Sequence, residues 1–479
     1  MSPHYLLAIV AAVLPVLHIL GVLSAIEVLL SRRNSQTSIA WCLFLVFFPV
    51  LGLPVYWTLG RSRFKGYQKR IARVVEHQQH SVQWYHQQIR DKVVKPDDPV
   101  PARAETFARI AGSEFVGEND LRLLIDGRAT FDAILEAIDR ASRFVLVEFF
   151  IVKDDGIGSE FKAKLLAAAA RGVRVFFMYD EVGSHSLPKT YLRDLREAGV
   201  EVTQFGTRKG GLRNFFQVNF RNHRKIVVVD GQVGFIGGHN VGDEYLGLDP
   251  YFGHWRDTHL RIEGPGVLHL KGIFFADWVW ATGKPPELEM LVPNAAGTAV
   301  VLTIPSGPAD EHARCLSYFT QCISSACSRV WISSPYFIPD EGLLNALYLA
   351  ALRGVDVRVL LPAKKDHLLV WLASFFYAPE AARRGVRLFR YRDGFLHQKA
   401  VVVDSLYASI GSANFDNRSF RLNFEATSLV YGAEFNTEVA KMLERDMAQS
   451  TEVTRERGAD FPLWKRVGSR FARLFSPIL

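Results

Sequence analysis

Two long apolar stretches near the N-terminus stand apart from the rest of the chain. Tyr5 to Ile26 and Ile39 to Leu59 contain no residue with a formal charge. Because about 20 helical residues span the hydrocarbon core of a bilayer, each stretch is long enough to cross a membrane. No lysine or arginine precedes the first stretch and a second one follows it, which argues against a cleaved signal peptide. The pattern predicts a two-helix transmembrane hairpin in residues 1–60.

The basic residues around these stretches predict how the hairpin is oriented. More lysine and arginine side chains follow the second stretch than lie between the two. The positive-inside rule then places both termini, and everything after residue 60, in the cytoplasm. The basic residues after the second stretch are Arg61, Arg63, Lys65, Lys69, Arg70 and Arg73, and those between the stretches are Arg32 and Arg33.

Beyond a polar connector, expected over residues 61–105, short apolar runs alternate with helical spacings. Phe144 to Val152 and Val173 to Tyr179 are typical of buried strands, and Gly158 to Arg171 between them has the spacing of a helix. Strands separated by helical crossovers indicate an α/β fold.

The same order of elements returns in the second half of the chain. Val330 to Ile338 and Val355 to Leu361 are strand-like, and Glu341 to Arg353 between them is helix-like. We therefore expect two similar α/β lobes, residues 106–290 and residues 291–450, related by a pseudo-two-fold axis.

One motif occurs once in each lobe with identical spacing: a histidine, a lysine two residues later, then aspartate, glycine and asparagine. Alternate side chains of a strand share a face, so the histidine and lysine of each copy point the same way. We expect both copies to contribute to one site where the lobes meet. The copies are His223, Lys225, Asp230, Gly237 and Asn240, and His397, Lys399, Asp404, Gly411 and Asn414.

The last segment, residues 451–479, has the pattern of a basic amphipathic helix. Its apolar residues fall on one side of a helical wheel and its lysine and arginine residues on the other. This arrangement suits an anionic membrane surface. Docking of the apolar side onto the core of the protein itself is an equal alternative.

Composition narrows the class of partner without choosing one. Of 479 residues, 49% are hydrophobic, which is ample for the cores of two lobes. The net charge of +8 favours anionic partners, either nucleic acid or acidic lipid. The cysteines follow no metal-binding spacing and are expected to be free thiols; they are Cys42, Cys315, Cys322 and Cys327.

The duplicated motif supplies the groups that cleavage of a phosphodiester needs. A neutral imidazole can attack phosphorus while a protonated one donates to the leaving oxygen, so the two motif histidines can share these roles. Lys225 and Lys399 supply positive charge, and Asn240 and Asn414 supply amide donors for the phosphate oxygens. This chemistry requires no metal and no other cofactor.

Two carboxylates later in the chain are candidates for orienting the histidines. Asp257 and Glu425 lie on strand-like segments at comparable distances after the two motifs. An acceptor on the second ring nitrogen fixes the tautomer of a catalytic histidine. We expect Glu425 to orient His397 and Asp257 to orient His223; the alternative is that both are ordinary surface carboxylates.

Weaker candidates lie near the motifs. Arg208, Lys209 and Arg213 precede the first motif and suit contact with lipid headgroups or a solvated loop equally well. Ser412 and Ser419 are candidate hydrogen-bond donors to phosphate.

The doubled H-x-K-x4-D-x6-G-x2-N signature resembles that of the phospholipase D superfamily. The runs R-N-H-R-K-I-V-V-V-D-G-x-V-G-F-I-G-G, S-P-Y-F-I-P-D and G-S-A-N-F-D-N-R-S-F-R-L-N-F-E resemble the bacterial cardiolipin synthases. The resemblance covers nearly the whole chain. It implies an α/β fold of duplicated phospholipase D-like lobes, with β-sheets flanked by helices, preceded by two transmembrane helices. It also implies the bacterial inner membrane, and the charge bias described above places the catalytic lobes on the cytoplasmic side.

The resemblance further implies a phosphatidyltransferase that joins two phosphatidylglycerol molecules into cardiolipin and releases glycerol through a phosphohistidine intermediate. By the commoner family pattern, His223 attacks and His397 protonates the departing glycerol. Asp230 and Asp404 belong to the family motif, although their place after buried strands favours a turn cap or structural ion pair.

The expected partners are phosphatidylglycerol, other anionic phospholipids and the membrane, with no nucleic acid and no cofactor. Phospholipase D-type hydrolysis of phospholipid, and less readily of nucleic acid, is the alternative. A non-catalytic scaffold is disfavoured because every motif residue is present in both copies.

Overall fold

The computed structural model describes residues 3–31, 35–60, 64, 66–77, 87–206, 219–289, 291–453 and 461–479. Contacts divide the chain into two units, one formed by Met1–Lys65 with Thr207–Phe220 and the other by Gly66–Gly206 with Arg221–Leu479. The basic residues Arg208, Lys209 and Arg213 lie outside the described residues, as do Arg32, Arg33, Arg61, Arg63 and Lys65.

The first unit contains the N-terminal helix α1 (Pro3–Leu29) and a second apolar segment that packs against it. Residues Ala11–Leu29 form the one helix, within the part of the chain that the structure describes, that is long and apolar enough to cross a membrane. Helix α1 and the second apolar segment approach closely at Gly21, where an added Cβ would lie 2.4 Å from the Leu45 carbonyl oxygen. This approach requires glycine.

The second apolar stretch does not form one continuous spanning helix. It contains α2 (Ser35–Phe47), α3 (Pro49–Val55) and the π-helical turn η1 (Tyr56–Gly60). Phe48 leaves helical geometry, with φ −130° and ψ 56°, and Pro49 starts the next helix. Proline cannot donate a backbone hydrogen bond and clashes with the preceding turn, which accounts for the break. The expected pair of transmembrane helices is therefore not confirmed.

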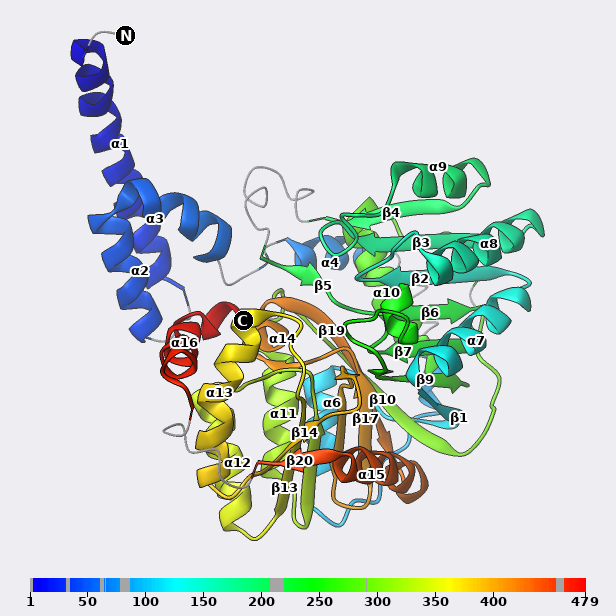
Figure 1. The fold of residues 1–479 in the computed structure, drawn as a ribbon. Helices are drawn as coiled ribbons and strands as arrows, with labels where there is room; N and C mark the ends of the chain where they lie inside the picture. Colours follow the sequence, from blue (N-terminus) through cyan, green and yellow to red (C-terminus); the bar gives the residue numbers. More distant parts are fainter. Residues whose placement is uncertain are drawn as a thin grey trace. The chain divides into compact units, whose positions relative to one another are not determined.

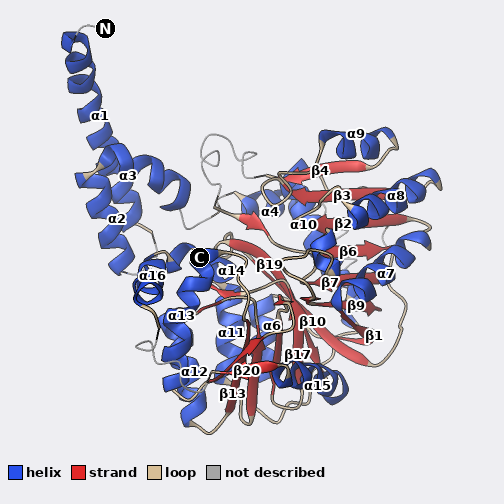
Figure 2. Ribbon diagram, viewed as in Figure 1, coloured by secondary structure: helices blue, strands red, loops and turns tan. Residues whose placement is uncertain are grey.

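The second unit is built on a single mixed sheet that runs through both lobes (Figures 1 and 2). Its two halves have the same topology, each with parallel strands at one side and antiparallel strands toward the middle. From one edge the order is β20 (Ser450–Glu452), β14 (Arg387–Tyr391), β13 (Asp356–Pro362), β11 (Arg329–Ser333), β16 (Ala400–Val403), β17 (Tyr407–Gly411), β19 (Asn423–Tyr431) and β10 (Ala299–Ser306). It continues through β1 (Val116–Ile125), β9 (Thr258–Glu263), β7 (Val233–Gly237), β6 (Ile226–Val229), β2 (Phe144–Phe149), β3 (Arg174–Asp180) and β4 (Glu201–Phe205).

The halves join where β1 pairs antiparallel with β10, and the repeat predicted from the sequence is thereby observed as one continuous sheet. Two short parallel pairs off the main path matter for the site. They join β5 (Arg221–Asn222) to β19, and β15 (Phe395–Leu396) to β8 (Trp255–Arg256). A third pair joins β12 (Phe337–Ile338) to β18 (Phe415–Asp416).

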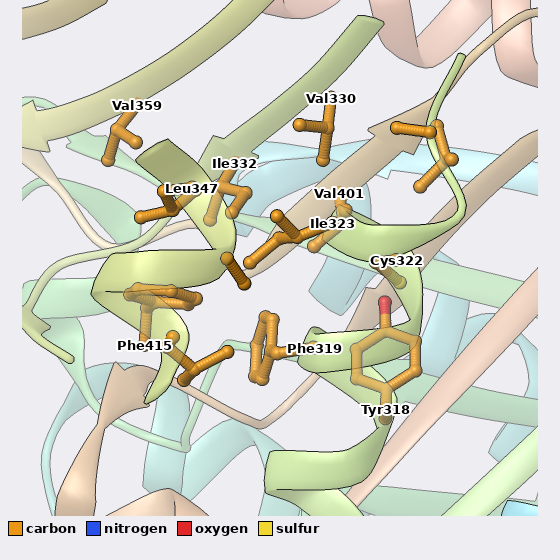
Figure 3. Packing of buried hydrophobic residues seen from close by; sticks show 14 of the residues in the cluster. Tyr318, Phe319, Cys322, Ile323, Val330, Ile332, Leu347, Val359, Val401 and Phe415 are labelled. Atoms are coloured by element: carbon orange, nitrogen blue, oxygen red, sulfur yellow. The ribbon is translucent and has the colours of Figure 1, made fainter. Parts of the chain in front are cut away.

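Helices cover the sheet and close one hydrophobic core in each lobe. Figure 3 shows the core of the second lobe, where Phe319 and Ile323 meet Val330, Ile332 and other apolar side chains. The first-lobe helices are α7 (Asp126–Asp139), α8 (Gly156–Ala170), α9 (Lys189–Glu197) and α10 (Val267–Thr282), with the 3-10 turn η3 (Asp243–Leu246). The second-lobe helices are α11 (Arg314–Ser324), α12 (Glu341–Leu352), α13 (Leu368–Arg383), α14 (Asn417–Arg421) and α15 (Ala433–Ala448).

One helix lies in the other lobe from the one expected. Helix α6 (Arg103–Ala111) falls at the predicted start of the first lobe, but Phe107 and Ala111 pack in the core of the second. Arg103 is buried there and lies 2.5 Å from Asp404 Oδ2 and 2.7 Å from Asp98 Oδ1. The chain therefore crosses to the second lobe before β1 opens the first.

The C-terminal segment forms helix α16 (Leu463–Leu474) and a last turn η4 (Ser476–Ile478). Helix α16 packs on α13 through Ala472 and Ser469, both buried, and Lys465 Nζ lies over the Phe375 ring. The apolar side points away from the lobe. Its exposed side chains are Leu463, Trp464, Val467, Phe471 and Leu474, each more than half exposed.

Candidate active site

The two short parallel strand pairs set the position of each motif histidine. The His223 backbone N–H donates to the Phe424 carbonyl oxygen at 2.9 Å, and the His397 N–H donates to the Arg256 carbonyl oxygen at 2.8 Å. Each histidine is thus tied to a strand of the opposite lobe, and the two arrangements are related by the pseudo-symmetry of the fold.

Phe424 and Arg256, whose carbonyl oxygens accept these bonds, are each followed in the chain by an acidic residue whose carboxylate contacts the histidine ring. His223 Nδ1 lies 3.0 Å from Glu425 Oε2, and His397 Nδ1 lies 2.6 Å from Asp257 Oδ2. The pairing predicted from the sequence, Glu425 with His397 and Asp257 with His223, is wrong. Each histidine strand runs beside the opposite lobe, so the neighbouring carboxylate comes from that lobe. All four side chains are buried.

Glu425 is held as an ion by several donors. Ser412 Oγ donates to its Oε2 at 2.5 Å, and Ser419 Oγ donates to its Oε1 at 2.9 Å. Burial alone would raise the pKa of Glu425, but contact with His223, the charge of Lys225 and the hydrogen bond from Ser412 hold it below its usual value. The two serines, considered above as donors to phosphate, are therefore bound to Glu425.

Both motif lysines lie beside the histidine of their own copy. Lys225 Nζ donates to the His223 carbonyl oxygen at 2.5 Å. Lys399 Nζ lies 2.6 Å from His397 Nδ1 and 3.6 Å from Asp257 Oδ2. Burial lowers the pKa of Lys399 to about 8 and that of Lys225 well below its usual value. Both ammonium groups are thus poised to gain from an incoming anion.

The ring nitrogens of both histidines are easier to deprotonate than in water. Burial lowers the pKa of His223, although Glu425 opposes the shift. Burial, together with the charges of Lys399 and Lys225, lowers the pKa of His397 further. At neutral pH, both imidazoles of the free protein are therefore available as neutral bases.

The two motif asparagines differ in their surroundings. Asn240 accepts from the Ile151 N–H at 3.1 Å and donates to the Tyr245 hydroxyl at 3.0 Å. Asn414 is buried, and its Oδ1 atom has no hydrogen-bond partner among the residues described. Among the residues described, the Asn414 Nδ2 group donates to no protein acceptor, whereas that of Asn240 donates to Tyr245, so the Asn414 N–H groups are the more available of the two to a phosphate oxygen.

Asp230 and Asp404 lie at the far ends of their motif strands and accept hydrogen bonds from a neighbouring loop. Each follows its lysine by five residues along a strand, a span of roughly 16 Å. Both adopt positive φ, +53° and +50°. Each accepts from consecutive backbone N–H groups at the start of the neighbouring strand in the sheet, β2 for Asp230 and β11 for Asp404. These loop residues are Ser142, Arg143 and Phe144 for Asp230, and Cys327, Ser328 and Arg329 for Asp404. Asp230 thus caps a turn, and Asp404 both caps a turn and forms the ion pair with Arg103.

Two aromatic side chains that no sequence motif marks lie beside the histidines. The Phe150 ring centroid lies 5.0 Å from that of His223, and the Trp255 centroid lies 5.1 Å from that of His397.

His239 and His259 form a second pair of buried histidines, with their Nδ1 atoms 3.2 Å apart. Burial lowers the pKa of His239 to about 4. In the described ranges, no group of three His, Cys, Asp or Glu side chains is arranged to hold a metal ion.

Comparisons with known proteins identify the family of the chain. A family profile described as "Cardiolipin synthase, PLD-like domain" matches residues 134–250 and 319–447, and one described as "Phospholipase_D-nuclease N-terminal" matches residues 19–61. Cardiolipin synthase A of Pseudomonas fluorescens is 47% identical over 485 residues, with 100% of this chain and 99% of that protein covered. Cardiolipin synthase A of Pseudomonas putida is 48% identical over 475 residues, covering 97% of each.

A solved structure supports the fold independently. Phosphatidylserine synthase of Haemophilus influenzae Rd KW20 matches with a TM-score of 0.60 at 14% identity, covering 79% of this chain and 100% of that one. Taken with the doubled motif and the full-length identity, these matches show that the chain belongs to the cardiolipin synthases of the phospholipase D superfamily.

Proposed function

We propose that the protein transfers a phosphatidyl group from one phosphatidylglycerol molecule to another, giving cardiolipin and glycerol. The observation that carries the proposal is the pair of histidines, each with a buried carboxylate at Nδ1 and a lysine beside it. The full-length likeness to cardiolipin synthase A supports transfer between lipids.

In the first step, Nε2 of His223 attacks the phosphorus of the donor lipid. The bond from phosphorus to the glycerol headgroup breaks, and the phosphatidyl group is left on His223. His397 gives a proton to the departing glycerol oxygen. Burial and then the charges of Lys399 and Lys225 hold the pKa of His397 low in the free protein; the phosphodiester anion offsets those charges, so this imidazole binds a proton when substrate arrives.

In the second step, His397 takes the proton from a headgroup hydroxyl of the acceptor phosphatidylglycerol. The hydroxyl oxygen attacks phosphorus and the bond between phosphorus and His223 breaks, which restores the starting protonation states. Glu425 and Asp257 stabilise the imidazolium form of the histidine that each contacts.

The positive and amide groups around the two rings stabilise the negative charge on the phosphate oxygens in the transition state. Lys225 and Lys399 supply two ammonium groups, and Asn414 supplies a buried amide. Fixed donors in a site closed to water stabilise the transition state more strongly than the same groups would in solution. We assign these three residues to the phosphate oxygens, with Asn240 fixing the wall of the site through Tyr245.

We further propose that the protein acts at the bacterial inner membrane, with α1 spanning it and the catalytic lobes on the cytoplasmic side. The length and apolar character of Ala11–Leu29 support the anchor. The basic residues after the second apolar stretch support the orientation, and the exposed apolar side of α16 supports a second contact with the lipid surface.

Product analysis tests the reaction. The purified protein in detergent is incubated with phosphatidylglycerol labelled in its phosphate, in the presence of a chelator, and the lipids are separated by thin-layer chromatography. Cardiolipin and an equal amount of free glycerol are expected. Phosphatidic acid as the sole labelled product would make water the acceptor and overturn the proposed transfer.

A further inference from the structure

A buried polar cluster lies directly behind His223 and involves the residues on both sides of it. Asp277, on α10, is fully buried and accepts from Arg224 Nη1 at 2.5 Å and from Asn222 Nδ2 at 3.1 Å, both through its Oδ2 atom. Asn222 and Arg224 are the neighbours of His223 in the chain. The Asp277 carboxylate therefore holds the backbone of the first motif from behind.

The same cluster reaches the carboxylate partner of His223. Arg224 Nε donates to the Glu425 carbonyl oxygen at 3.0 Å, and Arg224 Nη2 donates to the Ser306 carbonyl oxygen at 3.1 Å. Arg224 thus connects Asp277 of the first lobe to β19 and β10 of the second. Arg224 thus holds the backbone of Glu425, whose carboxylate contacts the His223 ring.

The remaining oxygen of Asp277 is occupied by a residue from outside both lobes. Tyr67 opens helix α4 (Tyr67–His77) in the polar connector, and its hydroxyl donates to Asp277 Oδ1 at 2.5 Å. Burial and the neighbouring Asp277 raise the pKa of Tyr67 well above its usual value, so the hydroxyl keeps its proton. The Tyr67 ring lies 4.9 Å from that of Phe424, whose carbonyl oxygen accepts from the His223 N–H.

We propose that Tyr67 is a positioning residue for the pair formed by His223 and Glu425. Its hydroxyl fixes the Asp277 carboxylate, which fixes Asn222 and Arg224 on either side of His223. Without the hydroxyl, one buried carboxylate oxygen loses its donor and the carboxylate is free to turn away from Arg224. The connector that follows the apolar N-terminal segments thus contributes to the geometry of His223. This inference rests on the proposed function of the two histidines.

The variant Tyr67→Phe tests the inference, since it keeps the ring and removes only the hydroxyl. We expect kcat for cardiolipin formation to fall roughly 10-fold with KM for phosphatidylglycerol unchanged, because a misplaced nucleophile impairs the chemical step rather than lipid binding. Tyr191→Phe is the matched control. It removes another buried tyrosine hydroxyl, which donates to the Gly158 carbonyl oxygen, and we expect kinetics like those of the unchanged protein.

Two backgrounds decide whether the effect passes through His223. In Glu425→Gln, where the pair is already impaired, we expect Tyr67→Phe to lower kcat less than about 2-fold further. In Asp257→Asn, which impairs His397, the full 10-fold loss should remain. A smaller folded fraction would reduce activity by the same factor in both backgrounds, and that result would overturn the inference.

Two further outcomes separate this inference from the proposed function. If the unchanged protein makes cardiolipin and Tyr67→Phe behaves like Tyr191→Phe, the inference alone fails. If the unchanged protein makes no cardiolipin, the proposed function fails first. Should Tyr67→Phe be too unstable to purify, Asp277→Asn, which keeps the shape of the side chain, must show the same dependence on background.

Discussion

His223 Nδ1 lies 3.0 Å from Glu425 Oε2, although 202 residues of chain separate the two. The mirror relationship, His397 with Asp257, spans 140 residues in the opposite direction. The carboxylate that contacts the histidine of each lobe therefore belongs to the other lobe, so each lobe completes the site of the other. A single lobe contains neither complete pair.

The crossed pairs predict the effect of removing each carboxylate charge. Glu425→Gln and Asp257→Asn should each lower kcat by about 10²- to 10⁴-fold, because the amide cannot stabilise an imidazolium and can select the wrong tautomer. Steady-state assays of cardiolipin formation measure this. The matched controls are Glu444→Gln, an exposed glutamate of α15, and Asp132→Asn, an exposed aspartate of α7. If all four variants retain full activity, the crossed pairs have no catalytic role.

The motif aspartates should affect stability and leave the chemistry intact. Asp404→Ala leaves the buried Arg103 without one of its carboxylates and should cost about 3–5 kcal/mol. Asp230→Ala loses hydrogen bonds from loop N–H groups and from the Ser142 hydroxyl but no ion pair, and should cost about 1–3 kcal/mol. Thermal unfolding measures the order of the two. Below the unfolding temperature, kcat per folded molecule should be close to that of the unchanged protein. A loss of kcat in a fully folded variant would restore a direct catalytic role.

Buried histidines predict a loss of stability in acid. Burial lowers the pKa of His269 from 6.5 to about 4, and its ring is held between Ser113 Oγ and the Thr303 N–H. Below pH 6.5 the unfolded chain binds a proton that the folded chain does not. Stability should therefore fall as pH decreases toward 4, by about 3 kcal/mol from this residue alone.

The variant His269→Gln isolates that contribution. Chemical denaturation at pH 7 and pH 5 should show a smaller pH dependence for His269→Gln than for the unchanged protein. His185→Gln, which alters an exposed histidine, is the matched control and should keep the original dependence. An unaltered dependence in His269→Gln would mean that this ring has the same pKa in the folded and the unfolded chain.

Helix α16 should contact lipid through its exposed apolar side. A polarity-sensitive fluorophore on Phe471→Cys, in a Cys327→Ser background, should shift to the blue when the protein is placed in vesicles containing phosphatidylglycerol. The shift should weaken at high salt, because the basic residues of α16 add electrostatic attraction. The same label on Val182→Cys, an exposed position of the first lobe, should not shift. Equal spectra at both positions would exclude lipid contact by α16.

The features that could be predicted from the sequence are those that depend on the spacing of residues within one segment. The two-residue step from His223 to Lys225 defines a strand face, and its recurrence at His397 defines the repeat. The assignment of carboxylates failed because Asp257 and Glu425 occupy equivalent positions after their motifs. Which carboxylate meets which histidine depends on the pairing of the two-residue strands β5 and β15 with strands of the opposite lobe. Strands this short leave no periodic pattern in the sequence.

Other features depended on contacts between distant segments. Tyr67 and Arg103 lie in polar connector sequence, and nothing local marks one as a partner of Asp277 and the other as a partner of Asp404. The break in the second apolar stretch did carry a local signal. Pro49 and Pro54 lie inside it, and proline interrupts helical hydrogen bonding.

The covalent intermediate tests the central claim most directly. Phosphatidylglycerol labelled in its phosphate is mixed with the unchanged protein, with His223→Ala and with His397→Ala, and the protein is denatured in alkali, under which phosphohistidine persists, before mapping of labelled peptides. We expect label on the peptide containing His223 in the unchanged protein and none on protein in His223→Ala. Cardiolipin should be absent from both variants. Label on His397 in the unchanged protein would reverse the two roles, and cardiolipin formed by His223→Ala would contradict the account.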